Sequence, residues 1–173
     1  MEFGYFKKPV MKKTTKCIPI FNNEDVKIGL IQRFYKNKAQ RIFDHILDEF
    51  FVNVEVMDAN SNTIVKATEN ISLKSMYRSS WMIDCKDKGR LVLEDRTKIK
   101  TNPTMKLIIN NDIYYLKKDF ADKRVRLEDS NQIIAEITYD KILPPATVSI
   151  EKKQSDLSVH LIACLYYILM LRE

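Results

Sequence analysis

Apolar and polar side chains alternate with a period of two through most of the chain, which is typical of strands with one buried face. In the run 52–56, three valines alternate with Asn53 and Glu55. Turn-forming segments such as 58–62 (DANSN) and 86–89 (KDKG) separate these runs. With short runs near Tyr5 and Ile18, the pattern predicts about a dozen strands, the signature of a barrel or a sandwich.

The run 26–34 is oriented by the same rule. Its apolar residues Val26, Ile28, Leu30 and Phe34 share one face, which we expect to be the buried one. Lys27 and Arg33 fall on the other face and are expected to lie in solvent.

Residues 37–50 (NKAQRIFDHILDEF) break the period of two. Their apolar side chains recur at helical spacing, which predicts a short amphipathic helix near 38–49. We expect this helix to cover one end of the sheet with its apolar face, formed by Ile42, Phe43, Ile46, Leu47 and Phe50.

A second helix is predicted after Ser155. From 157 to 171 only Ser158 and His160 interrupt the apolar side chains, so this helix must be covered on every side. At ~1.5 Å per residue this run reaches ~22 Å. Spanning a bilayer takes roughly 20 apolar residues, so the run is too short to cross one. Ser155 is the predicted cap, and Asp156 is expected to favour the positive end of the helix dipole. In a chain rich in strands, such a helix is expected to plug a rolled sheet.

The strand count, the run 113–140 (IYYLKKDFADKRVRLEDSNQIIAEITYD) and the run 147–173 (TVSIEKKQSDLSVHLIACLYYILMLRE) resemble the tubby C-terminal-like superfamily. This superfamily includes tubby proteins, phospholipid scramblases and the plant LURP-one-related proteins, and the chain is most similar to its small bacterial members. The resemblance implies a mainly β fold, a closed antiparallel β-barrel of about twelve strands around a buried hydrophobic C-terminal helix. It also implies one domain over residues 1–173.

The resemblance implies a non-enzymatic binding module that contacts anionic phospholipid headgroups at the cytoplasmic membrane face. A protein-interaction or scaffold domain with no lipid role is the alternative. The chain lacks the cysteine-rich tract, the acidic calcium loop and the proline-rich tail of the scramblases, which argues against scramblase activity.

Composition narrows the classes of partner. The net charge of +6 permits contact with anionic lipid or nucleic acid. Nucleic acid ranks behind lipid and protein, because the sequence has no recognition helix, ribonucleoprotein motif or zinc finger. The three cysteines, Cys17, Cys85 and Cys164, have no paired spacing, which favours reduced, buried thiols in a reducing compartment such as the cytoplasm.

Motifs for catalysis are missing from the sequence. It has no HExxH, CxxC, glycine-rich phosphate loop or nucleophile elbow, so we expect no enzyme, no cofactor and no catalytic residue. His160 is expected to be a hydrogen-bonded core histidine. A metal site formed by His45 with Asp44, Asp48 and Glu49 is conceivable, but a solvated polar face is favoured, so no metal is expected.

Five cations form the candidate lipid-phosphate or headgroup site: Lys117, Lys118, Lys123, Arg124 and Arg126. Arg124 and Arg126 should both face outward, because side chains two apart share one face of a strand. Two adjacent guanidinium groups could bind one phosphate. Since Asp119, Asp122, Glu128 and Asp129 lie in the same region, an intramolecular salt-bridged surface is the favoured alternative.

A second basic cluster lies near the start of the chain and contains Lys7, Lys8, Lys12, Lys13 and Lys16. Aromatic residues interleave with it, a composition that suits contact with a membrane surface. The favoured alternative is a solvated strand pair whose aromatic side chains, Phe3, Tyr5 and Phe6, point into the barrel.

Overall fold

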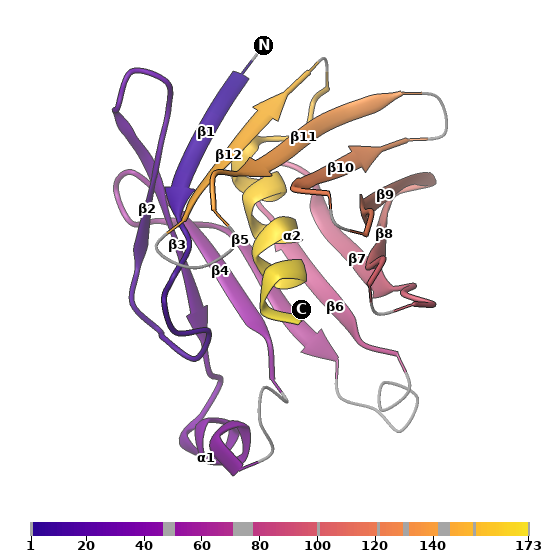
Figure 1. Ribbon diagram of the computed structural model, residues 1–173. Coiled ribbons are helices and arrows are strands. Elements are labelled where there is room, and N and C mark those ends of the chain that lie inside the picture. Colours follow the sequence, from indigo (N-terminus) through magenta and orange to yellow (C-terminus); the bar gives the residue numbers. More distant parts are fainter. Residues whose placement is uncertain are drawn as a thin grey trace.

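In the computed structural model, twelve antiparallel strands close into one barrel around a buried helix (Figure 1). The structure describes residues 2–46, 51–70, 78–99, 101–120, 122–129, 132–141, 146–153 and 155–172. The strands are β1 (Glu2–Lys7), β2 (Ile18–Phe21), β3 (Lys27–Phe34), β4 (Asn53–Asp58), β5 (Thr63–Asn70), β6 (Ser80–Cys85), β7 (Gly89–Asp95), β8 (Thr104–Ile109), β9 (Asp112–Lys118), β10 (Arg124–Glu128), β11 (Ile133–Tyr139) and β12 (Thr147–Lys152). The helices are α1 (Lys38–Ile46) and α2 (Val159–Arg172). The predicted fold class is confirmed.

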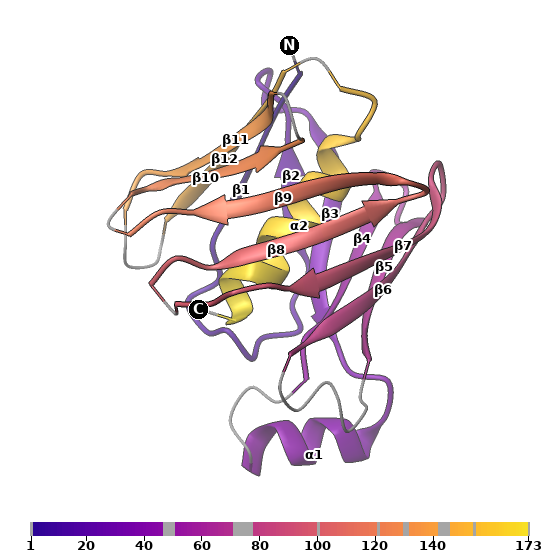
Figure 2. The same cartoon turned by 90° about the vertical axis from the view of Figure 1, so that its right-hand side faces the viewer.

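Each strand pairs with its neighbours in sequence, and β1 pairs with β12 to close the barrel, with Gly4 opposite Ile150. Because all pairs are antiparallel, successive connections alternate between the two ends of the barrel. The connections β1–β2, β3–β4, β5–β6, β7–β8, β9–β10 and β11–β12 therefore share one end. Helix α1 belongs to the β3–β4 connection and lies below the barrel in Figure 2. We call this end the α1 end.

Helix α2 fills the barrel, as the apolar run 157–171 predicted. All of its residues from Leu161 to Leu171 are buried. Its cap differs from the prediction, because Ser158 rather than Ser155 caps it: the Ser158 hydroxyl accepts the Leu161 N–H at 3.2 Å. Ser155 accepts the N–H of Leu157 in the preceding turn, and Asp156 pairs with Lys88 instead of lying in the first helical turn.

Two glycines let the start of α2 approach the barrel wall. A Cβ on Gly4 would lie 2.5 Å from Cγ1 of Val159, and one on Gly29 would lie 2.8 Å from Nε2 of His160. The same His160 nitrogen lies 2.9 Å from the carbonyl oxygen of Ile28. His160 is hydrogen-bonded as expected, but it is half-buried rather than a core residue, and its packing depends on a glycine in β3.

The predicted orientation of β3 is wrong. Gly29, Ile31 and Arg33 face the barrel interior, while Leu30 and Phe34 lie on the half-buried outer face. Two features reverse the apparent pattern: the interior requires a glycine beside His160, and it contains an arginine that a carboxylate neutralises.

The predicted orientation of α1 is also wrong. Ile42, Phe43 and Ile46 are exposed by 60%, 54% and 70%, whereas Asp44 is completely buried. The helix therefore directs its polar contacts inward and its apolar face outward. Leu47 and Phe50, the other residues of the predicted apolar face, lie outside the described residues.

Candidate functional site

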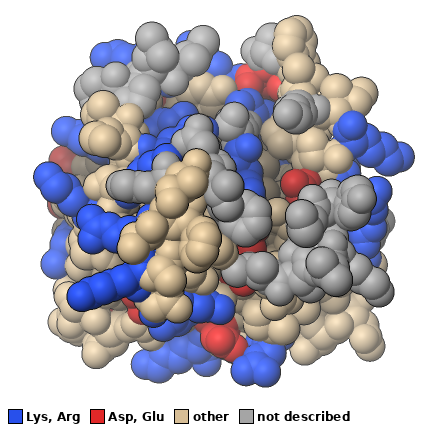
Figure 3. Space-filling model, turned by 90° about the horizontal axis from the view of Figure 1, so that it is seen from below, with Lys and Arg blue, Asp and Glu red and all other residues tan. Residues whose placement is uncertain are grey.

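The two ends of the barrel differ in charge. The described connections at the α1 end, with α1 itself, contain twelve basic and four acidic residues, against three basic and five acidic at the opposite end. The twelve are Lys8, Lys12, Lys13, Lys16, Lys36, Lys38, Arg41, Arg78, Arg96, Lys98, Lys123 and Lys141. Figure 3 views the molecule from this side, and blue basic side chains clearly outnumber red acidic ones. The end is therefore a positively charged surface.

Exposed apolar side chains gather at the same end. Among the described residues, nine large apolar side chains are exposed, and seven of them lie in connections at the α1 end. The seven, which we call the apolar tips, are Val10, Met11, Ile42, Phe43, Ile46, Ile99 and Phe120. The other two are Val26, in the β2–β3 connection, and Ile113, near the start of β9. The α1 end therefore combines positive charge with exposed apolar groups.

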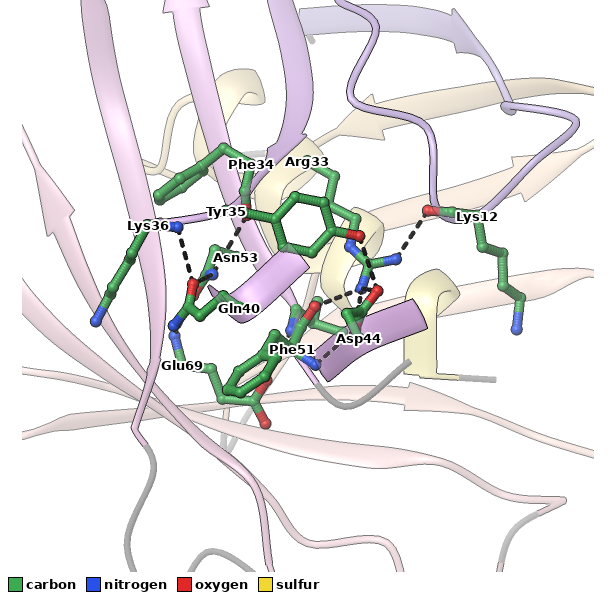
Figure 4. A network of polar contacts seen from close by, with 11 residues as sticks. Lys12, Arg33, Phe34, Tyr35, Lys36, Gln40, Asp44, Phe51, Asn53 and Glu69 are labelled. Carbon is green, nitrogen blue, oxygen red and sulfur yellow. Dashed lines mark hydrogen bonds and ion pairs between the residues drawn. The ribbon is translucent and has the colours of Figure 1, made fainter. Parts of the chain in front are cut away.

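Helix α1 is anchored at its start by short-range hydrogen bonds. The side-chain oxygen of Asn37 accepts the N–H of Gln40 at 2.8 Å, so Asn37 caps the helix. The Gln40 side chain in turn accepts the N–H of Lys36 at 2.8 Å and contacts Asn53 at 3.3 Å. Because Asn53 is buried in β4, this chain of contacts ties the first turn of α1 to the barrel wall (Figure 4).

A buried ion pair holds the last turn of α1 (Figure 4). Nη2 of Arg33 lies 2.8 Å from both carboxylate oxygens of Asp44, and neither side chain is exposed. Nη1 of Arg33 donates to the carbonyl oxygen of Lys12 at 3.1 Å. One arginine therefore fixes both α1 and the β1–β2 connection, which together carry five of the seven apolar tips.

The carboxylate of Asp44 accepts hydrogen bonds from further neighbours besides Arg33. It also accepts the Tyr35 hydroxyl at 2.7 Å and the Phe51 N–H at 2.9 Å. Burial first, and then this bond to Asp44, raise the pKa of Tyr35 to about 12. Asp44 is thus not part of a solvated polar face, which corrects the favoured sequence interpretation. The His45 side chain, Asp48 and Glu49 lie outside the described residues.

A second carboxylate, Glu69 on β5, is also paired inside this end of the barrel. It accepts the N–H of Val52 at 2.8 Å and forms an ion pair with Arg172, whose guanidinium lies over the ring of Trp81. Burial raises the pKa of Glu69 above its usual range, although Arg172 opposes the shift. Because the charges of Asp44 and Glu69 are neutralised inside, neither offsets the surface cations.

The structure brings most of the predicted cluster on β9 and β10 together. Arg126 lies opposite Lys117 in the sheet, and Val125 lies opposite Lys118. Arg124 and Arg126 face outward as predicted, while Val125 and Leu127 face the core. Lys123 belongs to the β9–β10 connection at the α1 end.

Acidic neighbours pair with these cations. Arg124 contacts Asp122 at 3.2 Å, and Arg126 contacts Asp119 at 3.4 Å. Lys117 contacts Glu128 at 2.9 Å, and Lys118 lies over the ring of Tyr139. The side-chain hydrogen bond from Arg124 is the largest cause that lowers the pKa of Asp122. The cluster is a salt-bridged surface in this structure, and its role as a phosphate site stays a prediction.

The basic cluster near the start of the chain falls at the α1 end. Lys7 ends β1, and the other four lysines lie in the β1–β2 connection. Of its aromatic side chains only Phe6 points into the barrel, because Phe3 and Tyr5 lie on the half-buried outer face, where Tyr5 stacks on Phe21. The expectation that all three face inward is wrong.

Sequence reasoning missed the gathering of apolar tips at one end. The signal was present, because an up-and-down barrel places every second connection at the same end. Grouping alternate connections of the predicted barrel would have collected the basic residues from the sequence alone. The exposure of Ile42, Phe43 and Ile46 depends on the orientation of α1, which the sequence does not show.

The family model for the Tubby C-terminal like domain matches residues 5–173. The chain matches no curated protein and no solved structure. In the part of the chain that is described, neither helix is long and apolar enough to cross a bilayer.

Proposed function

Because the chain belongs to the Tubby C-terminal like domain family, we propose that it is a non-enzymatic binding module whose α1 end docks on anionic phospholipid headgroups at the cytoplasmic membrane face. The observation that supports this function is the charge difference between the two ends of the barrel. In this orientation the end whose described connections contain twelve basic and four acidic residues lies toward the membrane, and the opposite end faces away.

Electrostatic attraction would orient the protein before it contacts the membrane. Each basic side chain near an anionic bilayer contributes about 1 kcal/mol, and the attraction decays over roughly 10 Å at ordinary salt. The field therefore steers the α1 end toward the membrane and repels the opposite end, which selects one orientation before any contact forms.

The cluster on β9 and β10 would take part at the edge of this contact. Lys123 is in the α1-end connection, and Arg124 begins the strand that follows. A lipid phosphate could replace Asp122 as a partner of Arg124 and Arg126, because both arginines are partly exposed and can bind a phosphate through two N–H groups.

The experiment is flotation with phosphatidylcholine vesicles, with or without about one part in four of phosphatidylglycerol, at ~0.1 M salt. We expect the protein to float only with the anionic vesicles. The variant Lys16→Glu/Lys38→Glu should lose most binding. The matched control Lys27→Glu/Lys86→Glu changes the same charge at exposed positions toward the other end and should bind like the parent.

Equal loss in both variants would contradict docking by the α1 end and indicate a response to net charge alone. A third variant, Arg124→Glu/Arg126→Glu, tests the cluster on β9 and β10. Unchanged flotation of that variant would remove the cluster from the site and leave the docking of the α1 end intact.

A further inference from the structure

The apolar tips are not explained by attraction to headgroup charge. Exposed single apolar residues are common on protein surfaces, but seven of the nine found among the described residues lie at one end, which is an unusual distribution. They come from four separate connections: β1–β2, β3–β4, β7–β8 and β9–β10.

Helix α1 shows most clearly how apolar tips and cations are placed together. At about 100° per residue, Ile42, Phe43 and Ile46 fall within an arc of roughly 100°, and Asp44 lies on the opposite side. Lys38 is exposed beside this arc, and Arg41 is exposed farther round the helix, between Ile42 and Asp44. The Arg33–Asp44 ion pair holds the polar side inward, so the apolar arc is fixed outward with the exposed Lys38 at its edge. Helices that lie in a membrane interface have this composition.

Charge argues against a second copy of the chain as the occupant. Two α1 ends face to face would bring together two surfaces on which the described basic residues outnumber the acidic ones, and like charges repel. An anionic bilayer offers the opposite charge together with an apolar layer just below it. It also accommodates protrusions at separate positions, because lipid rearranges around each one.

We propose that the apolar tips of the α1 end, led by Phe43 and Ile46, penetrate the boundary between the headgroups and the acyl chains of an anionic membrane. This inference rests on the proposed docking function and adds to it a hydrophobic component that salt does not screen. Interfacial helices bury their apolar face about 5–10 Å deep, which leaves the flanking lysines at headgroup level.

Tryptophan fluorescence can test the insertion directly. Trp81, the single tryptophan of the chain, is completely buried and donates to the carbonyl of Val52 at 2.7 Å, so it supplies a constant background. Phe43→Trp places a reporter on α1. Val26→Trp is the matched control, because Val26 is 52% exposed, close to the 54% of Phe43, and lies at the opposite end.

With phosphatidylcholine–phosphatidylglycerol vesicles, we expect a blue shift for Phe43→Trp and quenching by lipids brominated on the acyl chain. Val26→Trp should show neither. As a second measurement, Phe43→Ser should lower vesicle affinity by about tenfold, whereas Val26→Ser should leave it unchanged. The part of the binding that survives high salt should disappear with Phe43→Ser.

The outcomes separate the two proposals. Vesicle binding without quenching of Phe43→Trp would overturn insertion and leave headgroup docking standing. Absence of vesicle binding would overturn both. A blue shift of Phe43→Trp that appears without vesicles as protein concentration rises, together with a dimer in sedimentation, would instead assign the apolar tips to self-association.

Discussion

Arg33 and Asp44 form an ion pair that is closed to solvent, with Nη2 of the arginine 2.8 Å from both carboxylate oxygens. The arginine comes from the barrel wall and the aspartate from α1, so the pair determines how the helix is presented. Without it, the sequence of α1 would favour the reverse orientation, with its apolar face against the protein.

Removing one member of this pair should destabilise the fold strongly. We expect Asp44→Ala to lower the free energy of unfolding by about 3–5 kcal/mol, because it leaves the Arg33 charge buried without its partner. Denaturant unfolding measures this loss. Asp122→Ala, which removes a partner of the partly exposed Arg124 and Arg126, is the control and should have a small effect. Equal losses in the two variants would show that burial of the pair is unimportant.

A double-mutant cycle can test the contact between β1 and α2. We expect Gly4→Ala to cost about 1–3 kcal/mol, because the new Cβ would lie against Cγ1 of Val159. Val159→Ala removes that carbon, and the next nearest atoms lie 3.7 and 3.8 Å away. Gly4→Ala should therefore cost little in the Val159→Ala background, as measured by thermal or denaturant unfolding.

The corresponding pair on β3 should behave differently. A Cβ on Gly29 meets the backbone oxygen of Met57 at 2.6 Å as well as the His160 ring. Since His160→Ala leaves that oxygen in place, it should not rescue Gly29→Ala. Rescue at Gly29, or its failure at Gly4, would contradict the contacts described for these two positions.

Thiol reactivity should distinguish the three cysteines. Cys85 and Cys164 are buried as expected, but Cys17 is exposed, which corrects the expectation of buried thiols. Burial, helped by Asp87, raises the pKa of Cys85 to about 11, and burial also raises the pKa of Cys164. At pH 8 we expect a thiol reagent to modify one cysteine of the folded protein quickly and all three after denaturation. Fast reaction at two or more sites of the folded protein would show that the barrel opens readily.

Glu69 should give stability a distinctive dependence on pH. Burial raises its pKa above the ordinary 4.5, so the folded protein holds this proton more tightly than the unfolded chain. By linkage, its contribution to stability is fully present at low pH and falls as pH rises from about 4.5 through the raised pKa. The stability of the parent relative to Glu69→Gln should therefore decrease across that range.

Unfolding at several pH values, with both proteins in the same buffers, measures this difference. The comparison cancels groups such as Asp58 and Asp156, whose lowered pKa values give the opposite slope in both proteins. A relative stability that rises with pH would mean that the ion pair with Arg172 outweighs the burial of Glu69.

Much of the fold could be predicted from the sequence, because two of its signals are strong. The run from Leu157 to Leu171 has no polar face, so it had to be buried all round, and the strand pattern supplied a barrel to contain it. The positions of both helices along the chain also followed from periodicity. The cap at Ser158 was missed because Ser155 precedes the same run and is equally suited to capping.

Orientation could not be predicted, because periodicity shows that a segment has two faces without showing which one is inside. In β3 both faces carry apolar residues, and the inward position of Arg33 depends on Asp44 in a different element. In α1 the same ion pair turns the apolar face outward. The α1 end was not apparent as a candidate site, because the residues of this end come from connections that are far apart in the chain.

The pairing of β1 with β12 has a consequence for synthesis on the ribosome. Glu2 lies opposite Lys152, and the helix that fills the barrel is translated after all twelve strands. Until then, the emerging strands expose an unfilled apolar face, and β1 lacks one of its two neighbours. Such long-range pairings form late, and incomplete barrels are prone to aggregate. Translation speed over 153–172, and the availability of chaperones while those residues emerge, should therefore influence how much of this protein reaches the folded state.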